Sequence, residues 1–300
     1  METTTEKFAQ LWACVEHHRP SIEAALRLYL PLAPPHVGTR FNEAVEYALF
    51  SGGKRLRPVL TILGAELFGA TPESVMPAAV AGEFIHTSSL IFDDLPCMDN
   101  AHERRGKDSL HEKFGEGLAV LVAICFLNAS YSLVFVNHSN LPERAMLAHA
   151  ELVECIGAAG MIGGQSVDLA IAAGAGGGAP VSDLESVRNL KTSALMRLSL
   201  RVGAILAGAS VLDLAALSRF AEALGEAYQL SDDLIDLEED GDIFRDEQKT
   251  LALSEGKRTA GLELERKVGD AKRILVEHFP ASDARSCLMQ LAEYLGERKA

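Results

Sequence analysis

The chain has 300 residues, of which 48% are hydrophobic, and it carries a formal net charge of -14 at pH 7. This length and apolar fraction are sufficient for a substantial buried core. The acidic surface repels polyanions, so we expect no nucleic-acid partner, and a site for a phosphorylated ligand would need a local cluster of lysines and arginines.

The cysteines and apolar runs bear on the redox compartment of the protein and on whether it spans a membrane. The five cysteines are scattered, odd in number and without a CxxC pair, which argues against a disulfide framework and a zinc site. The longest strongly apolar run, residues 118–127, is about half the length that a transmembrane helix needs. The N-terminus shows no basic region followed by an apolar one. We expect a protein that is not membrane-spanning and is cytoplasmic, or plastidic if a transit peptide was removed.

Helical patterns dominate the chain. From Thr39 onward, apolar residues recur three and four positions apart on one helix face, and the same spacing returns from Leu214. Aromatic residues make up only 6% of the chain, and β-branched residues seldom alternate with polar ones, so strand signals are scarce. We predict an all-α fold in which residues 1–300 form a single domain, a bundle of about ten or more helices.

A basic segment precedes one of these predicted helices. Residues 52–58, GGKRLRP, place three cations after two flexible glycines. A helix N-terminus favours anions, an arginine offers a planar fork to phosphate oxygens, and a lysine offers a mobile point charge. Taken alone, such a segment is more often a solvated charge run than a phosphate site.

The first acidic segment ends a largely apolar stretch, residues 80–95, which we interpret as a buried helix. Asp93 and Asp94 close this stretch, Asp99 follows shortly after, and a pair of arginines comes next along the chain. Unpaired buried carboxylates are costly, and a bound divalent cation is one of the few ways to offset that cost. The segment therefore indicates a metal site.

The clearest predicted loop is the glycine-rich run 173–183. A phosphate-cradling role is conceivable for it, but no GK[ST] sequence or strand supports that role, so we interpret it as a connector.

A second acidic segment, residues 228–240, has the same character. Asp232 and Asp236 are four residues apart and share one helix face, and no lysine or arginine stands near them on that helix. A single cluster of this kind is as often a solvated helix face as a site. Two clusters that face each other across a bundle would hold magnesium, which takes few carboxylates and completes its shell with water and substrate phosphates.

Six motifs now make a family resemblance clear. The chain resembles the trans-isoprenyl diphosphate synthases, short-chain branch, which includes geranylgeranyl and farnesyl diphosphate synthases. The resemblance covers about residues 51–236 and implies an all-α bundle around a deep central cavity. The motifs, in the family's order, are GGKRLRP, DDLPCMD, RRGK, GGQSVDL, KTSAL and YQLSDDLID.

The resemblance implies about three magnesium ions. Asp93 and Asp99 would hold two of them and Asp232 the third, with Asp94 and Asp236 in or next to that shell. The metals would bridge the diphosphate of an allylic substrate, which is dimethylallyl, geranyl or farnesyl diphosphate.

The resemblance also assigns the two diphosphate sites. The allylic diphosphate would contact Arg104, Lys191 and Gln229, with Thr192 beside Lys191. The isopentenyl diphosphate pocket would contain Lys54, Arg57, His86 and Arg105. The catalytic set is then Asp93, Asp99, Arg104, Lys191, Gln229 and Asp232. Gln165 would lie near the cationic carbon that forms during the reaction. On its own, His86 in an apolar helix would be interpreted as a hydrogen-bonded core histidine.

One departure from the family concerns the loop after the second acidic motif. Residues 239–249 lack the usual GK…GKD stretch, which supplies a further diphosphate-binding lysine. Arg245 or Lys249 is expected to substitute for it.

The product length is inferred from Ser88 and Ser89, one helical turn before Asp93. In the family, a large aromatic residue there stops the chain at farnesyl; two serines leave the path open toward Ile85, then Ala81 and Gly82. We expect geranylgeranyl diphosphate as the main product and farnesyl diphosphate as the alternative. A different interpretation is that both serines bond back to carbonyls four residues earlier and have no bearing on length.

Two other functions compete with this one. A class I terpene cyclase would not be expected to carry GGKRLRP. A non-catalytic subunit of a heteromeric synthase typically loses aspartates, whereas this chain keeps both clusters. Members of the family are usually homodimers, which we expect here.

Overall fold

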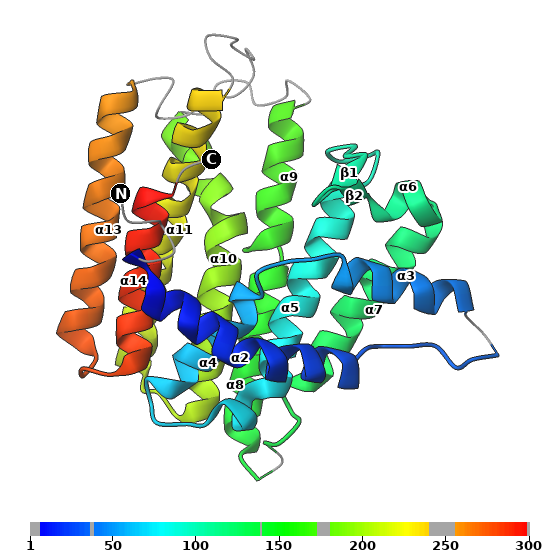
Figure 1. Cartoon of the computed structure of the whole chain (residues 1–300), viewed down its shortest axis with the longest axis horizontal. Helices are drawn as coiled ribbons and strands as arrows, with labels where there is room; N and C mark the ends of the chain where they lie inside the picture. The colour runs from blue at the N-terminus through cyan, green and yellow to red at the C-terminus, as the bar shows by residue number, and fades with distance from the viewer. Residues whose placement is uncertain (1–6, 37–38, 139, 173–180, 240–255, 299–300) are drawn as a thin grey trace.

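The computed structural model describes residues 7–36, 39–138, 140–172, 181–239 and 256–298; of residues 171–172, 181–192 and 236–239 it describes the backbone alone. Within these ranges the chain is almost entirely helical, as predicted (Figure 1). The helices are α2 (Ala9–Leu28), α3 (Thr39–Phe50), α4 (Leu56–Glu66), α5 (Pro72–Asp94), α6 (Leu110–Phe114), α7 (Glu116–Leu133), α8 (Pro142–Ile156), α9 (Met161–Ala172), α10 (Val181–Ala207), α11 (Val211–Glu239), α13 (Lys257–His278) and α14 (Asp283–Glu297).

Helix α5 is a central helix of the bundle. It begins with Pro72, which suits a first helical position because proline has no N–H to leave unsatisfied there. Its side chains are buried around most of its circumference, and it packs against α4, α7 and α10. A helix that is apolar all round belongs in a core. The burial continues to its last residues, Asp93 and Asp94, so the helix delivers two carboxylates from the core to one end of the bundle.

Helices α4 and α10 approach each other closely along their backbones. A Cβ atom on Gly203 of α10 would lie only 1.9 Å from the carbonyl oxygen of Thr61 on α4. No residue larger than glycine fits this crossing without a shift of the helices. The close contact fixes α4, and with it the basic segment that precedes α4, against the core.

The C-terminal ends of α5, α9 and α11 lie at the same end of the molecule (Figure 1). The two acidic segments predicted to cooperate are therefore on one side of the bundle, although they are far apart in the sequence. Helix α2 crosses the bundle, and α14 runs beside α11 and α13.

A short hairpin follows α5 and was not predicted. Strands β1 (Glu103–Arg104) and β2 (Lys107–Asp108) pair antiparallel. Arg105 and Gly106 between them have φ of 56° and 72°, and positive φ at both central positions defines the tight turn that hairpins favour. Its two-residue strands are too short to produce an alternating sequence pattern.

Three segments are long and apolar enough to cross a membrane by length and composition: Pro72–Asp94, Glu116–Leu133 and Pro142–Ala170. The first is 78% buried inside the protein, which explains its apolar character, but the other two are each only 33% buried. Exposed apolar side chains gather on α7, α8 and α9, and include Leu121, Ile124, Met146, Leu147, Val153 and Ile162.

Candidate active site

The first acidic cluster is built by the end of α5 and the turn that follows it. Asp93 and Asp94 are buried, with 9% and 3% of their surfaces exposed. The chain then folds back on the helix end, because the Asp99 N–H donates to the Asp93 carbonyl oxygen at 2.9 Å and the Ala101 N–H donates to that of Asp94 at 3.2 Å. The backbone of the exposed Asp99 is thus held beside the helix end.

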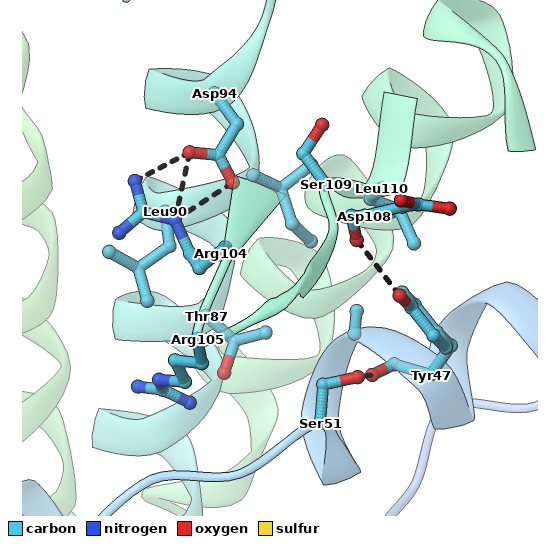
Figure 2. Close-up of a pocket in the computed structure, with 12 residues that line it drawn as sticks. Tyr47, Ser51, Thr87, Leu90, Asp94, Arg104, Arg105, Asp108, Ser109 and Leu110 are labelled. Atoms are coloured by element: carbon cyan, nitrogen blue, oxygen red, sulfur yellow. Dashed lines mark hydrogen bonds and ion pairs between the residues drawn. The ribbon is translucent and has the colours of Figure 1, made fainter. Parts of the chain in front are cut away.

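Asp94 is bound by Arg104 of the hairpin. The Arg104 Nε lies 2.8 Å from both carboxylate oxygens of Asp94, and Nη2 donates to one of them (Figure 2). The Asp94 carboxylate raises the pKa of Arg104. Besides the divalent cation that the sequence indicates as one way to offset the burial of this cluster, Arg104 supplies a counter-charge to Asp94. Charge-assisted paired hydrogen bonds of this kind also orient both groups.

Arg57, His86 and Arg105 are neighbouring basic side chains beside this cluster, close enough to interact electrostatically. Burial, and then the neighbouring charges of Arg57, Arg105, Arg104 and Arg55, hold the pKa of His86 well below its ordinary value. His86 Nδ1 and Arg57 Nε are buried and have no hydrogen-bond partner among the described residues. Burial also lowers the pKa of Arg57 and of Arg105. A group of desolvated cations with unpaired polar atoms favours an anionic ligand.

Arg105 is held over the glycine pair of the basic segment. Its Nη1 donates to the carbonyl oxygen of Gly52, and in Figure 2 its side chain points away from that of Arg104. A Cβ atom on Gly53 would lie 2.8 Å from Arg105 Nη1, and Gly53 has a φ of 126°. The second glycine is therefore needed both for its backbone conformation and for the approach of this arginine.

Arg55, the cation of residues 52–58 to which the resemblance assigns no site role, serves the fold rather than a ligand. It lies in the left-handed region with a φ of 56° and is 4% exposed. Its guanidinium pairs with Glu23 at 2.7 Å and with Glu83 at 2.8 Å, and it donates to the Leu49 carbonyl oxygen at 2.8 Å. Lys54 is exposed, and its Nζ lies 3.3 Å from the Tyr294 hydroxyl on α14.

The second acidic cluster has a cationic partner that sequence reasoning missed. The prediction that no cation stands near Asp232 holds for α11 itself, but Arg298, from just beyond α14, forms an ion pair with Asp232. Arg298 also donates to the Ser231 hydroxyl at 2.8 Å and to the Tyr228 carbonyl oxygen at 2.9 Å. Its guanidinium lies 4.1 Å from the centre of the Tyr228 ring.

Some predicted site residues cannot be placed. The side chains of Lys191, Thr192 and Asp236, and the whole of Arg245 and Lys249, lie outside the described residues. Gln229, also on α11, is partly buried one helical turn from Asp232 and Asp233.

The residues present fit a magnesium site by the chemistry of their donors. Among the described side chains, no three His, Cys, Asp or Glu residues form a ready-made metal cluster. Asp93, Asp99 and Asp232 offer only hard oxygen atoms. Magnesium needs few carboxylates when phosphate oxygens and water complete its shell, so a sparse set of aspartates suits a metal that arrives with a diphosphate.

An apolar cavity of about 460 Å³ opens behind Asp93. Its polar lining residues are Ser88, Ser89, Asp93, Gln165 and Ser166. The cavity is lined by Ile85, Ser88, Ser89, Phe92, Asp93, Met98, Leu127, Ile156, Met161, Ile162, Gln165, Ser166 and Leu169. Leu127 and Ile156, from α7 and α8, were not predicted, since their apolar character alone does not distinguish a cavity wall from packed core.

The two serines do not make the hydrogen bonds that the alternative interpretation required. Ser88 donates across to the Ala123 carbonyl oxygen on α7 at 2.9 Å, and Ser89 donates to the His86 carbonyl oxygen at 2.8 Å. Ile85 lines the cavity as expected, but Ala81 and Gly82 do not. A Cβ atom on Gly82 would instead face Thr61 and Ser199 on other helices.

Comparisons with known proteins agree with this geometry. The family model of polyprenyl synthetase matches residues 39–278. The chain is 36% identical over 293 residues to geranylgeranyl pyrophosphate synthase 11, chloroplastic, of Arabidopsis thaliana, covering 93% of this chain and 79% of that protein. It is 38% identical to the chloroplastic geranylgeranyl pyrophosphate synthase of Capsicum annuum, over 93% of this chain and 76% of that protein. The crystal structure of an FPP/GFPP synthase from Zymomonas mobilis is similar, with a TM-score of 0.86 and 28% identity over 97% of this chain and 100% of that one.

Proposed function

Since the chain belongs to the polyprenyl synthetase family, we propose that it is a magnesium-dependent synthase whose main product is geranylgeranyl diphosphate, with farnesyl diphosphate as the alternative. The chain is a prenyltransferase that elongates a prenyl chain from isopentenyl and allylic diphosphates. The names of the plant relatives support the longer product. The observation that carries the proposal is the apolar cavity that begins at Asp93.

The allylic diphosphate would be held where α5 and α11 end. Asp93, Asp99 and Asp232 would hold about three magnesium ions, with Asp94 and Asp236 beside them. Bound magnesium would stabilise the negative charge that develops on the departing diphosphate. Arg104, which is bound to Asp94 beside these ligands, would add its positive charge to the stabilisation of the departing diphosphate. The roles of Lys191, Thr192 and Gln229 rest on the family resemblance alone.

The isopentenyl diphosphate would be bound by the cationic pocket of Arg57, His86 and Arg105, with Lys54 at its edge. The open donors of Arg57 and His86 support this role, because a diphosphate supplies the negative charge and the acceptor oxygens that the pocket lacks. Neutral His86 can still donate one hydrogen bond to a phosphate oxygen. The double bond of the bound molecule would then attack the allylic carbon near Gln165.

The growing tail would enter the cavity behind Asp93. The wall formed by α5 has serines one turn back and Ile85 two turns back, at a distance of about 12 Å along the helix. Among the described lining residues the aromatic one is Phe92, which directly precedes Asp93 in the sequence, whereas Ile85, Ser88 and Ser89 line the cavity further back along α5. An open path of this kind supports a product longer than farnesyl.

We also propose that two copies of the chain form a homodimer through α7 and α8. Leu121 and Ile124 on α7, and Met146 and Leu147 on α8, are between 51% and 58% exposed, and large apolar side chains exposed in groups favour an interaction site. Burial between two copies would account for these residues without a membrane. The relatives with chloroplastic names agree with a plastid location, and a cytoplasmic one is the alternative.

The proposed reaction is tested with the purified protein, magnesium, isopentenyl diphosphate and each of the three allylic primers. We expect incorporation with all three, loss of incorporation on chelation, and a twenty-carbon main product. A protein that makes no product alone but changes the product of a partner synthase would instead be a non-catalytic subunit, and the proposal would be wrong.

A further inference from the structure

Lys54 lies against two aromatic rings that come from opposite ends of the chain. Its Nζ is 5.5 Å from the centre of the Trp12 ring on α2 and 5.7 Å from that of Tyr294 on α14. The same Nζ lies 3.3 Å from the Tyr294 hydroxyl oxygen. Ring faces attract ammonium groups at these distances, so the side chain has a defined resting place although it is exposed.

The two rings form a fixed platform. Trp12 and Tyr294 meet edge to face with centres 5.2 Å apart, and Tyr294 meets Phe8 in the same manner at 5.6 Å. Phe8 is 1% exposed, and both platform rings are partly buried against the core. Because these contacts hold the two rings in place, they offer the lysine a fixed binding surface.

The backbone places Lys54 near this platform but does not fix the conformation of its side chain. Gly52 and Gly53 turn the chain with φ of 119° and 126°, and the next residue, Arg55, is anchored by Glu23 and Glu83. A lysine side chain on such a turn still has four flexible torsions. Contacts of the Lys54 ammonium group are therefore needed to select one side-chain conformation.

We propose that Trp12 and Tyr294 are positioning residues that hold the Lys54 ammonium at the isopentenyl diphosphate pocket; the inference rests on the proposed function, in which Lys54 belongs to that pocket. An ammonium group has three donors. One reaches the Tyr294 hydroxyl, the ring faces take none in a conventional hydrogen bond, and two remain for phosphate oxygens. Residues 39–278 match the family model, so both rings lie outside the matched region.

A double-mutant cycle tests this proposal. Trp12→Leu and Tyr294→Leu should each raise the KM for isopentenyl diphosphate about two- to fivefold, with kcat and the KM for the allylic primer unchanged. Trp12→Phe, which keeps a ring, should restore most of the loss. In a Lys54→Met background the ring variants should have no further effect, because the group they position is absent. Ring variants that raise both KM values, or that act equally in the Lys54→Met background, would show a purely structural role and overturn the proposal.

A binding measurement separates this proposal from the proposed function. Trp12 is the one tryptophan of the chain, so its fluorescence reports on Lys54 directly. Isopentenyl diphosphate, added without magnesium or primer, should change the emission of wild type saturably, and much less so that of Lys54→Met. If Lys54→Met lowers the affinity while Tyr294→Leu, which keeps Trp12, does not, the pocket stands and the positioning role is wrong. If Lys54→Met binds as wild type does, both the placement of Lys54 and its positioning are overturned.

Discussion

Arg298, the last described residue at the C-terminus, forms an ion pair with Asp232 on α11. The pair joins two positions that are 66 residues apart in the sequence. Because Asp232 is the proposed metal ligand of the second acidic cluster, the C-terminal segment is attached to the active site. The Arg298 side chain is 14% exposed and the Asp232 side chain is 44% exposed, so water screens this half-buried contact in part.

We predict that Arg298→Ala lowers the free energy of unfolding by about 1–2 kcal/mol, because it removes an ion pair, two further hydrogen bonds and a ring contact. Urea denaturation without magnesium measures this change. Arg273→Ala is a matched control, since Arg273 pairs with Asp270 but is 64% exposed, and it should change stability by less than about 0.5 kcal/mol. Equal effects of the two substitutions would mean that the Arg298 contact does not stabilise the fold.

The second prediction concerns the proposed metal ligands. Asp93→Ala and Asp232→Ala should each lower kcat by at least about a hundredfold, because each removes an oxygen ligand from the groups that stabilise the departing diphosphate. Thermal unfolding should show that both variants still fold. Glu103→Ala, which removes an exposed acid from the neighbouring hairpin, should retain activity. Near wild-type turnover in either aspartate variant, with magnesium still required, would refute the metal assignment.

The buried His86 makes stability depend on pH. Its pKa is held well below the ordinary value by burial and by the charges of Arg57, Arg105, Arg104 and Arg55. The unfolded chain therefore binds a proton near pH 6.5 that the folded chain does not, and the free energy of unfolding falls as the pH drops below about 6.5. We predict that His86→Gln reduces the stability lost between pH 7 and pH 5. Identical pH profiles for this variant and wild type would contradict the placement of a neutral histidine among these arginines.

The arginines around His86 also predict that a bound ligand changes the pKa of this histidine. A bound diphosphate offsets the arginine charges, so the pKa of His86 should rise when isopentenyl diphosphate is added. A histidine titration followed by NMR, with and without the ligand, measures this shift. A fall in the pKa, or no change at saturation, would place the ligand elsewhere.

Local sequence patterns predicted the all-α fold and the position of the first acidic cluster. The apolar run that becomes α5 ends at Asp93 and Asp94, and a buried helix that ends in carboxylates can be recognised within one segment. The resemblance then named Lys54, Arg57, His86 and Arg105 together, and in the structure Arg57 and Arg105 lie close enough to His86 to lower its pKa.

What could not be predicted depends on contacts between distant segments. Arg298 pairs with Asp232, and Lys54 lies against Trp12 and Tyr294. These residues are far apart in the sequence, and no local pattern around any of them indicates its partner. The hairpin that presents Arg104 to Asp94 has strands of two residues, below the length at which alternation is visible. The contacts of Tyr294 and Arg298 depend on the packing of α14 against α2 and α11, which a local sequence pattern does not reveal.

The central claim is that the cavity behind Asp93 sets the product length, and one comparison of products tests it most directly. Ser88 is fully buried, lines this cavity and bonds to Ala123. With magnesium, isopentenyl diphosphate and farnesyl diphosphate, wild type should make geranylgeranyl diphosphate. Ser88→Ala, which loses only the hydroxyl, should do the same.

Ser88→Phe, supplied with geranyl diphosphate, should fold and stop at farnesyl diphosphate, because an aromatic ring cannot share the cavity with a fourth isoprene unit. Overpacking of this kind costs about 1–3 kcal/mol, so thermal unfolding is measured alongside. Chain-length analysis of the products tests this prediction. A shift from twenty to fifteen carbons would support the role of the cavity in setting product length. A wild type that stops at farnesyl diphosphate, or a folded Ser88→Phe variant that still makes geranylgeranyl diphosphate, would contradict it.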